Sequence, residues 1–207
     1  MAVNTVTTKT VFLDKDGTLI ENDPFDRRPD HIRLLPGTVE GLKLLHQAGY
    51  ALVVITNQSG IAHGWFTRDA VTYEEISLRI RLATFAIPLA GFYVCPHHPD
   101  GTIQEYRMDC LCRKPKPGLL MQAACELRLD LARSWMIGDI LHDVEAGCSA
   151  GCKTVLLTNG HETEWEMTPA RWPDLVADNV LEAAHLIMVT DQSLTGERPR
   201  PLNAEEE

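Results

Sequence analysis

Six short apolar segments, separated by stretches with helical periodicity, constrain the fold of this chain more than any other feature. This alternation of strands and helices is typical of an α/β fold with a doubly wound, Rossmann-like parallel sheet. The expected strands are residues 10–13, 51–56, 91–95, 134–137, 153–157 and 175–177. The expected helices are residues 39–48, 67–86, 118–129, 141–150 and 179–188, with Gly49 and Gly151 as stops after the first and fourth.

The chain has 207 residues, enough for one well-buried core, and we expect a single domain over residues 1–189. The polar segment 190–207 has no periodicity and is expected to be a flexible tail. Two long irregular stretches, 20–37 and 96–117, follow predicted strands, where ligands of open parallel sheets bind. They are the expected walls of a site, and neither gap between motifs is long enough for a cap domain.

Charge and hydropathy exclude several classes of partner. The formal net charge of −10 argues against nucleic acid, whose binding needs clustered Lys and Arg. No apolar run reaches the length of a membrane span, and the first ten residues lack the apolar stretch of a secretory signal. We therefore expect no membrane partner and a cytoplasmic location. No heptad pattern indicates an assembly, so a monomer is expected.

The segment VFLDKDGT places two carboxylates, Asp14 and Asp16, directly after the first predicted strand. Carboxylates one residue apart at a strand end can face the same site, while Gly17 allows a sharp turn. One can attack an electrophile and the other can transfer protons. Taken alone, the segment could equally be an acidic turn, because Asp and Gly are common in turns. Three further segments at later strand ends favour the catalytic interpretation.

Two of those segments offer groups that can hold phosphate. ITNQSG ends the second strand, and the hydroxyl of Thr56 with nearby backbone amides can bind phosphate oxygens. CRKPKPG presents Arg113 and Lys114 on a stiff proline-rich loop, where a fixed cation can offset the charge of a transferring phosphoryl group. The structural alternatives are a polar strand-to-helix loop for the first segment and a solvated basic pair for the second.

The remaining segment, MIGDILHDVEAG, places Asp139 directly after a strand and Asp143 one helical turn later. Magnesium takes oxygen ligands and commonly uses one or two carboxylates with waters and substrate phosphate. We therefore expect a Mg²⁺ site at Asp14, Asp16 and Asp139. Asp143 is expected to support the site from outside or to charge the helix N-terminus.

A second metal site is predicted in the loop after the third strand. Its ligands form C-x-H and C-x-C pairs, namely Cys95, His97, Cys110 and Cys112. Three thiolates and one imidazole make a closed tetrahedral set, typical of structural zinc. His98 could replace His97, because the spacing allows either.

Zinc binding is expected to fold this loop and to hold Arg113 and Lys114 above the site. The other three cysteines, Cys125, Cys148 and Cys152, fall in helical patterns and are expected to be small core residues.

In this order, the four segments from residue 11 to residue 157 resemble the haloacid dehalogenase superfamily of phosphohydrolases. The resemblance implies a Mg²⁺-dependent phosphatase in which Asp14 forms an aspartyl-phosphate and Asp16 acts first as general acid and then as general base. It also implies that the Asp14 and Asp139 carboxylates and the Asp16 backbone carbonyl hold Mg²⁺. Thr56 and Lys114 are then expected to stabilise the phosphoryl group.

Within the superfamily, the runs CPHHPDG, CLCRKPKPG and TNQSGIAHGWF are similar to the phosphatases that act on the 7-phosphate of a heptose 1,7-bisphosphate in lipopolysaccharide assembly. The histidinol-phosphate phosphatases share the zinc loop and are the main alternative. A relative that binds phosphate or a partner without turnover is the alternative from another class.

The narrower resemblance also implies a substrate-binding wall, in which Arg113 recognises the remote phosphate. The other expected wall residues are Asn22, Asp23, Pro24, Phe25, Asn57, Gln58 and Ser59. His63 and Trp65 depart from that group, which commonly carries basic residues there, and Ile140 follows Asp139 where Lys is usual.

Overall fold

The computed structural model describes residues 7–21, 32–160 and 166–195. The strands in this part of the chain are β1 (Thr10–Leu13), β2 (Ala51–Asn57), β3 (Gly91–Cys95), β4 (Trp135–Gly138), β5 (Lys153–Leu157) and β6 (Leu175–Ala177). The α-helices are α1 (Thr38–Gln47), α2 (Gly60–His63), α3 (Arg68–Ala83), α4 (Gly118–Leu127), α5 (Leu141–Ala150) and α6 (Val180–Thr195). Within the described ranges, short 3-10 turns cover Leu131–Arg133 and Pro169–Arg171.

The strands form one parallel sheet in the order β3-β2-β1-β4-β5-β6. The chain enters at the centre with β1, moves outward through β2 and β3, and then returns to place β4 on the other side of β1. Val11 accordingly has Leu52 as its partner on β2 and Trp135 as its partner on β4. The direction of winding reverses between β1 and β4, which confirms the predicted doubly wound sheet and defines its topological switch point.

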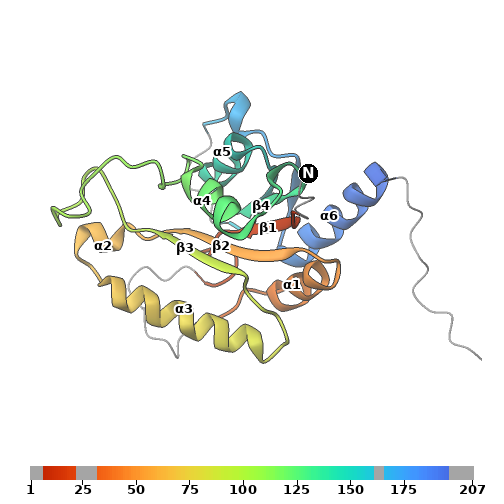
Figure 1. The fold of residues 1–207 in the computed structure, drawn as a ribbon, viewed down its shortest axis with the longest axis horizontal. Coiled ribbons are helices and arrows are strands. Elements are labelled where there is room, and N and C mark those ends of the chain that lie inside the picture. Colours follow the sequence, from red (N-terminus) through yellow and green to blue (C-terminus); the bar gives the residue numbers. More distant parts are fainter. Residues whose placement is uncertain (1–6, 22–31, 161–165, 196–207) are drawn as a thin grey trace, which may run out of the picture.

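Helices cover both faces of the sheet (Figure 1). On one face, α4 and α5 pack over a cluster that includes Phe12, whereas Val11 and Leu13 belong to the cluster under α1, α3 and α6. These three consecutive side chains are fully buried because β1 is central and covered on both faces. A continuous apolar run is therefore needed here, and it fixes the position of the polar residues that follow it.

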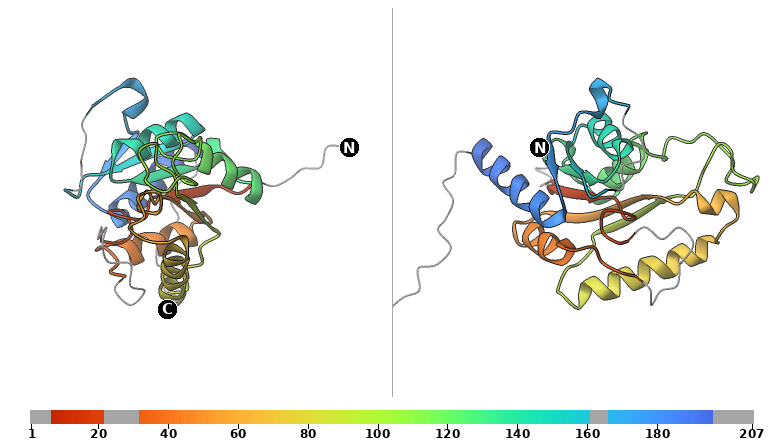
Figure 2. Two further views of the ribbon diagram at one scale, coloured as in Figure 1. Left: turned by 90° about the vertical axis from the view of Figure 1, so that its left-hand side faces the viewer. Right: turned by 180° about the vertical axis from the view of Figure 1, so that it is seen from behind.

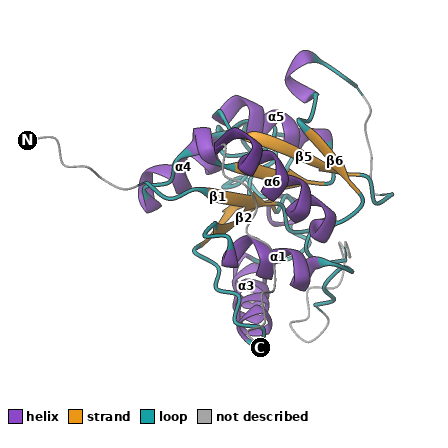
Figure 3. Ribbon diagram, turned by 90° about the vertical axis from the view of Figure 1, so that its right-hand side faces the viewer, coloured by secondary structure: helices purple, strands orange, loops and turns teal. Residues whose placement is uncertain are grey.

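Helices α1 and α6 lie side by side on their face of the sheet (Figure 3). The contact is close enough that a Cβ on Gly41 would lie 2.5 Å from the carbonyl oxygen of Val180. Glycine in the middle of α1 therefore sets the distance between the two helices, although glycine ordinarily weakens a helix.

The helix predicted at 67–86 is shorter than expected, since α3 covers Arg68–Ala83. Its predicted N-cap is confirmed, because the Thr67 hydroxyl accepts a hydrogen bond from the Ala70 N–H at 3.2 Å. The short helix α2 was not predicted. It is a single turn that ends at Gly64, whose φ of 72° is left-handed, and one turn is too short to produce a periodic pattern.

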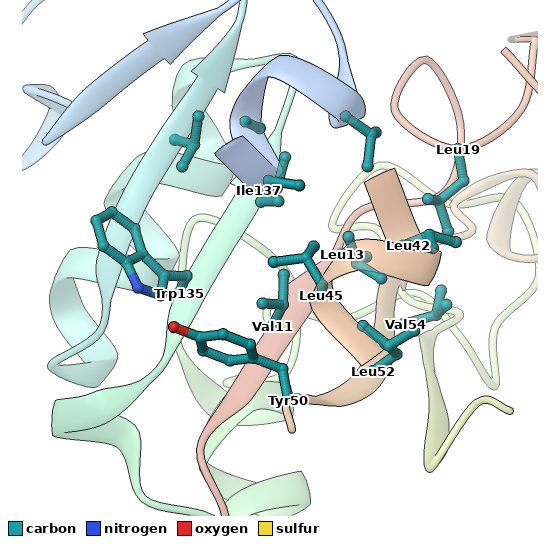
Figure 4. Packing of buried hydrophobic residues seen from close by; sticks show 14 of the residues in the cluster. Val11, Leu13, Leu19, Leu42, Leu45, Tyr50, Leu52, Val54, Trp135 and Ile137 are labelled. Atoms are coloured by element: carbon teal, nitrogen blue, oxygen red, sulfur yellow. The ribbon is translucent and has the colours of Figure 1, made fainter. Parts of the chain in front are cut away.

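Helix α6 extends to Thr195, so the prediction of a tail beginning at residue 190 was wrong for residues 190–195. Its polar end is held by Asp191, which accepts hydrogen bonds from the Tyr50 hydroxyl, from Lys153 Nζ at 3.0 Å and from Trp135 Nε1 at 3.5 Å. Figure 4 shows the Tyr50 hydroxyl directed toward the Trp135 ring. Residues 196–207 lie outside the described part of the chain.

The cysteine prediction was right for one residue and wrong for two. Cys152 is buried, whereas Cys125 and Cys148 lie on the exposed sides of α4 and α5. Helical periodicity placed them on helices but did not settle which side faced the sheet. Among the described helices, none combines the length and apolar character that a membrane crossing requires.

Candidate active site and metal centres

Three neighbouring strands carry polar residues at the switch point of the sheet. Asp14 directly follows β1, Thr56 lies near the end of β2, and Asp139 directly follows β4. The Asp14 N–H donates to the carbonyl of Ile137 at 2.9 Å, which extends the pairing of β1 with β4 by one residue. All three polar side chains are buried, at 7% exposure or less. The structure therefore brings these residues, predicted from separate motifs, to one edge of the sheet.

The side chain of Lys114 reaches into this edge from the loop before α4. Its ammonium donates to the Asp14 carboxylate and to the Ile55 carbonyl at 3.0 Å, and it lies 2.6 Å from Oδ1 of Asp143. Only 2% of the lysine side chain is exposed. One buried cation is thus shared between the Asp14 carboxylate, which follows β1, and the Asp143 carboxylate, which lies in the first turn of α5.

Asn57, at the end of β2, holds the backbone of Lys114. Its Nδ2 donates to the Lys114 carbonyl and its Oδ1 accepts from the Lys114 N–H, each at 3.1 Å. This paired contact fixes the lysine backbone in both directions, so the side chain can enter the site from a loop without helical or strand support. Asn57 was predicted as a substrate contact, and the structure shows it in this supporting position.

Burial and crowding dominate the electrostatics of the site. Burial, with smaller contributions from the Asp143 and Asp16 carboxylates, outweighs the lowering effect of Lys114 and raises the pKa of Asp14 to about 7. Burial, followed by the Asp14 and Asp143 carboxylates, raises the pKa of Asp139 to about 8. Burial alone lowers the pKa of Lys114, but Asp14 and Asp143 together raise it well above its ordinary value. Lys114 therefore stays charged. The carboxylates of Asp14 and Asp139, in contrast, have too little positive charge near them to keep their ordinary low pKa values.

The donor set of the site fits a small divalent cation. Oxygens of Asp14, Asp139 and Asp143 all lie within 4.8 Å of one another. Three carboxylates face one ammonium, and the raised pKa values of two of them mark a need for more positive charge. Magnesium prefers such oxygen ligands. Asp143 is already paired with Lys114, which is consistent with its predicted supporting position.

The Asp16 carboxylate lies outside this metal cluster and is held by other groups. Its Oδ2 accepts a hydrogen bond from Gln58 Nε2 at 2.7 Å, and its Oδ1 lies 3.0 Å from Lys15 Nζ. Gly17 adopts the expected left-handed turn, with φ of 84°. Its carbonyl accepts from Asn159 Nδ2 at 2.6 Å, which ties the turn to the end of β5. Asp14 and Asp16 are therefore held by different partners, Lys114 for the first and Gln58 and Lys15 for the second.

The expected substrate wall is described only in part. Residues 22–25 lie outside the described residues. Gln58 is buried, and its Nε2 donates to both Asp16 and the Thr56 hydroxyl, the latter at 2.8 Å. Ser59 is the residue before α2, where its hydroxyl makes no capping bond. Gln58 thus connects two residues that were predicted to act on phosphate.

The predicted zinc ligands converge into one cluster made of Cys95, His97, Cys110 and Cys112. The three Sγ atoms lie 3.1, 3.4 and 3.6 Å apart, and His97 Nδ1 lies 3.3 Å from Cys112 Sγ. Bonds of about 2.3 Å to a tetrahedral zinc require S···S edges of roughly 3.8 Å, close to this spacing. All three cysteines are free thiols. The set therefore fits zinc.

The alternative ligand, His98, faces away from the sulfur cluster. Its Nδ1 accepts from the Asp100 N–H at 3.1 Å, and its ring lies 4.8 Å from that of His63, which in turn stacks on Trp65. The structure therefore favours His97 over His98.

The zinc loop is tied to the active site and to α2. Lys114 follows Cys112 by two residues, and Arg113 Nη1 donates to the His97 carbonyl at 3.5 Å. On the other side, the Ile103 N–H donates to the Ala62 carbonyl of α2 at 2.8 Å. Figure 2 shows this loop and α2 projecting together beyond the same edge of the sheet. The loop can thus fix the position of the lysine that enters the site.

Sequence reasoning missed two supporting residues, Glu74 and Asn159, and one contact between predicted residues. Glu74 on α3 pairs with Lys15 beneath Asp16, Asn159 holds the Gly17 carbonyl, and the partner of Asp143 is Lys114. Glu74 and Asn159 lie outside the motifs at the strand ends. The one signal for the first contact was Lys15 itself, a charged residue between two carboxylates and directly after a buried strand.

Two family models match this chain. The Polynucleotide kinase 3 phosphatase model matches residues 9–143, and the HAD-hydrolase-like model matches residues 111–183. Together they span all the strand-end residues described above.

Curated relatives and solved structures resemble the chain over most of its length. The D-glycero-beta-D-manno-heptose-1,7-bisphosphate 7-phosphatase of Pasteurella multocida is 44% identical over 153 residues, or 73% of this chain and 83% of that protein. The Yersinia pestis protein of the same name is 40% identical over 147 residues, or 71% and 78%. The D,D-heptose 1,7-bisphosphate phosphatase of B. bronchiseptica, solved with magnesium and phosphate, is 29% identical with a TM-score of 0.75, covering 88% and 99%.

Proposed function

The chain belongs to the haloacid dehalogenase superfamily, in the family of the heptose-1,7-bisphosphate 7-phosphatases, and we propose that it hydrolyses the 7-phosphate of D-glycero-D-manno-heptose 1,7-bisphosphate. The observation that carries the proposal is the convergence of Asp14, Lys114 and Asp139 in one buried cluster at the switch point. A carboxylate nucleophile, a fixed cation and an oxygen-rich metal site are the parts that phosphoryl transfer to an aspartate needs.

In the first step, a carboxylate oxygen of Asp14 attacks phosphorus while the bond from phosphorus to the sugar oxygen breaks. The leaving oxygen takes a proton from Asp16, which acts as general acid. Asp16 can do this because its carboxylate lies outside the metal cluster and is directed by Gln58 and Lys15 instead. The products of this step are the free sugar hydroxyl and an Asp14 acyl-phosphate.

In the second step, water attacks the phosphorus of the acyl-phosphate and the bond to Asp14 breaks. Asp16, now ionised, accepts a proton from this water, and inorganic phosphate leaves. Asp14 and Asp16 are then both restored for another turnover. Asp16 therefore carries out both proton transfers, while Asp14 forms and releases the bond to phosphorus.

Lys114 and Thr56 hold the transferring phosphoryl group. The Lys114 ammonium remains charged and rigid, so it offsets charge on the phosphoryl oxygens without reorganising during the reaction. Asp14 and Asp139, which lie in the carboxylate cluster, would hold Mg²⁺ together with the Asp16 backbone carbonyl, and the metal would keep the nucleophile ionised and neutralise phosphate charge.

Recognition of the rest of the substrate falls to loops beyond the sheet edge. We assign Arg113 to the remote phosphate, since it directly follows Cys112 and its guanidinium is held against the zinc loop by the His97 carbonyl. Asn22, Asp23, Pro24, Phe25 and Ser59 remain proposed substrate contacts. The zinc in this proposal is structural, and the protein acts as a monomeric cytoplasmic enzyme with one phosphatase domain.

A polynucleotide 3-phosphatase is the second candidate, because that family model matches residues 9–143. The formal charge of −10 opposes it, since polynucleotide substrates are held by clustered cations. Histidinol phosphate is the other alternative substrate, and it has a single phosphate.

The decisive experiment measures phosphate release with Mg²⁺ from both anomers of heptose 1,7-bisphosphate, histidinol phosphate and a 3-phosphorylated oligonucleotide. We expect the highest kcat/KM with one heptose bisphosphate anomer. A preference for histidinol phosphate or the oligonucleotide would keep the chemistry and replace the substrate. No turnover of any ester would favour a phosphate-binding protein without activity.

A further inference from the structure

Lys15 is a buried cation that forms no bond and transfers no proton in the proposed mechanism. It lies between Asp14 and Asp16 in the sequence, but its side chain is fully shielded from solvent. A charged ammonium so far from water requires nearby carboxylates, because desolvation without a partner is costly. The structure supplies two of them, and one comes from an element outside the active-site motifs.

The first partner of Lys15 is Glu74, on the buried side of α3. Glu74 Oε2 lies 2.5 Å from Lys15 Nζ, and the glutamate side chain is only 5% exposed. The second partner is Asp16, whose Oδ1 lies 3.0 Å from the same nitrogen. Lys15 therefore bridges the middle of α3 and the carboxylate proposed to transfer protons.

The bridge completes the support of Asp16. Gln58 Nε2 donates to Oδ2 at 2.7 Å, while Lys15 contacts Oδ1, so each oxygen of the carboxylate has its own donor. The two donors come from different segments, because Lys15 follows β1 and Gln58 follows β2. Together they fix the rotation of the Asp16 carboxylate about its Cβ–Cγ bond. Glu74 is in closer contact with Lys15 than Asp16 is, so the glutamate anchors the ammonium and Asp16 makes the longer contact.

We propose that Glu74 is a positioning residue for proton transfer, which acts through Lys15 to hold the Asp16 carboxylate toward the leaving oxygen. The proposal rests on the assignment of Asp16 as general acid in the proposed function. It extends the catalytic apparatus to α3, which contributes no residue to the metal cluster of the described chain. Without Glu74, Asp16 is the one remaining partner of Lys15 among the described residues. The Lys15 ammonium then moves closer to the Asp16 carboxylate and changes its position.

The test compares two classes of phosphate ester in Glu74→Gln. An alkyl ester, such as the preferred sugar phosphate, needs a proton on its leaving oxygen, whereas p-nitrophenyl phosphate releases a stabilised phenolate. Because kcat/KM reports the steps through departure of the leaving group, misplacing the acid affects mainly the alkyl ester. We expect kcat/KM to fall by about 10- to 100-fold for the alkyl ester and by less than about 3-fold for the aryl ester.

Glu75→Gln is the matched control, since Glu75 is the next residue on α3 and pairs with Arg79 rather than with Lys15. Glu75→Gln should leave kcat/KM unchanged for both the alkyl and the aryl ester. If Glu74→Gln folds poorly, the double variant Lys15→Met/Glu74→Gln removes both buried charges together and should show the same selective loss. Lys15→Arg, which keeps the cation, should retain more alkyl-ester activity than Lys15→Met.

Equal losses on both esters in a folded Glu74→Gln protein, or no loss on either, would overturn the positioning role while leaving the proposed function intact. A wild-type protein that hydrolyses neither ester would instead overturn the proposed function and this inference with it.

Discussion

The ammonium of Lys114 donates a hydrogen bond to the carboxylate of Asp14, although 100 positions of sequence separate the two residues. The contact is possible because Asp14 emerges from the central strand, while Asn57 fixes the Lys114 backbone beside the neighbouring strand. The last residue of the predicted zinc cluster, Cys112, lies two residues before the lysine. The ammonium beside the nucleophile thus comes from a loop that directly follows the cluster of predicted zinc ligands.

Replacing Asp14 by Asn tests the nucleophile. The amide cannot form the acyl-phosphate, so we expect kcat to fall by roughly 10⁴-fold or more. The fold and zinc content should be retained, because Asn has nearly the same shape and the zinc ligands lie elsewhere. Phosphate release from the preferred ester gives the rate, and Asp109→Asn, an exposed carboxylate paired with Lys116, is the control. Undiminished turnover would remove Asp14 from the mechanism.

Magnesium should stabilise the protein more strongly as pH rises. The pKa values of Asp14 and Asp139 are raised from 3.8 to about 7 and about 8 in the metal-free fold. The folded state thus holds these protons more tightly than the unfolded chain, so their contribution to stability is greatest below about pH 4 and is lost as pH rises through the folded-state pKa values. Magnesium binds the ionised carboxylates and offsets this loss.

The expected result is therefore a small increase in Tm with Mg²⁺ near pH 5 and a larger one near pH 8, measured by thermal unfolding with and without the metal. Asp139→Asn removes one ligand and should weaken the dependence on Mg²⁺ at the higher pH. An increase in Tm that is the same at both pH values would contradict the assigned ligands.

The sequence was sufficient to predict the sheet and the strand-end residues, because apolar runs and the polar residues that end them are local signals. Asp14, Thr56 and Asp139 converge as expected once the parallel order is known. Contacts such as Glu74 with Lys15 depend instead on where a helix packs. Helical periodicity predicts which side of a helix is buried, but not which residues that side contacts. The missed end of α6 has the same cause, since its polar residues are held by tertiary partners rather than by an apolar pattern.

Replacing each of the two adjacent histidines by alanine, one at a time, tests the zinc site. His97 Nδ1 faces Cys112 Sγ, whereas His98 Nδ1 accepts from the Asp100 backbone. We expect His97→Ala to lower bound zinc and, through the loop, to reduce activity. His98→Ala should retain zinc at the wild-type stoichiometry, measured by metal analysis of the purified protein. Cys125→Ser is a second control, because that thiol is exposed on α4. Loss of zinc from His98→Ala alone would reverse the assignment.

Asp191 should stabilise the last turns of α6 without taking part in catalysis. Burial raises its pKa, but hydrogen bonds from Tyr50 and Lys153 outweigh this effect and lower the pKa below its ordinary value. Asp191→Asn removes the charge that those donors contact, so we expect a loss of about 1–3 kcal/mol in unfolding free energy and faster amide exchange in residues 190–195. His185→Gln, at an exposed position on the same helix, should change neither quantity. If exchange in residues 190–195 is unchanged in Asp191→Asn, the helix end is held by other contacts, and kcat of the folded variant should equal the wild-type value in either case.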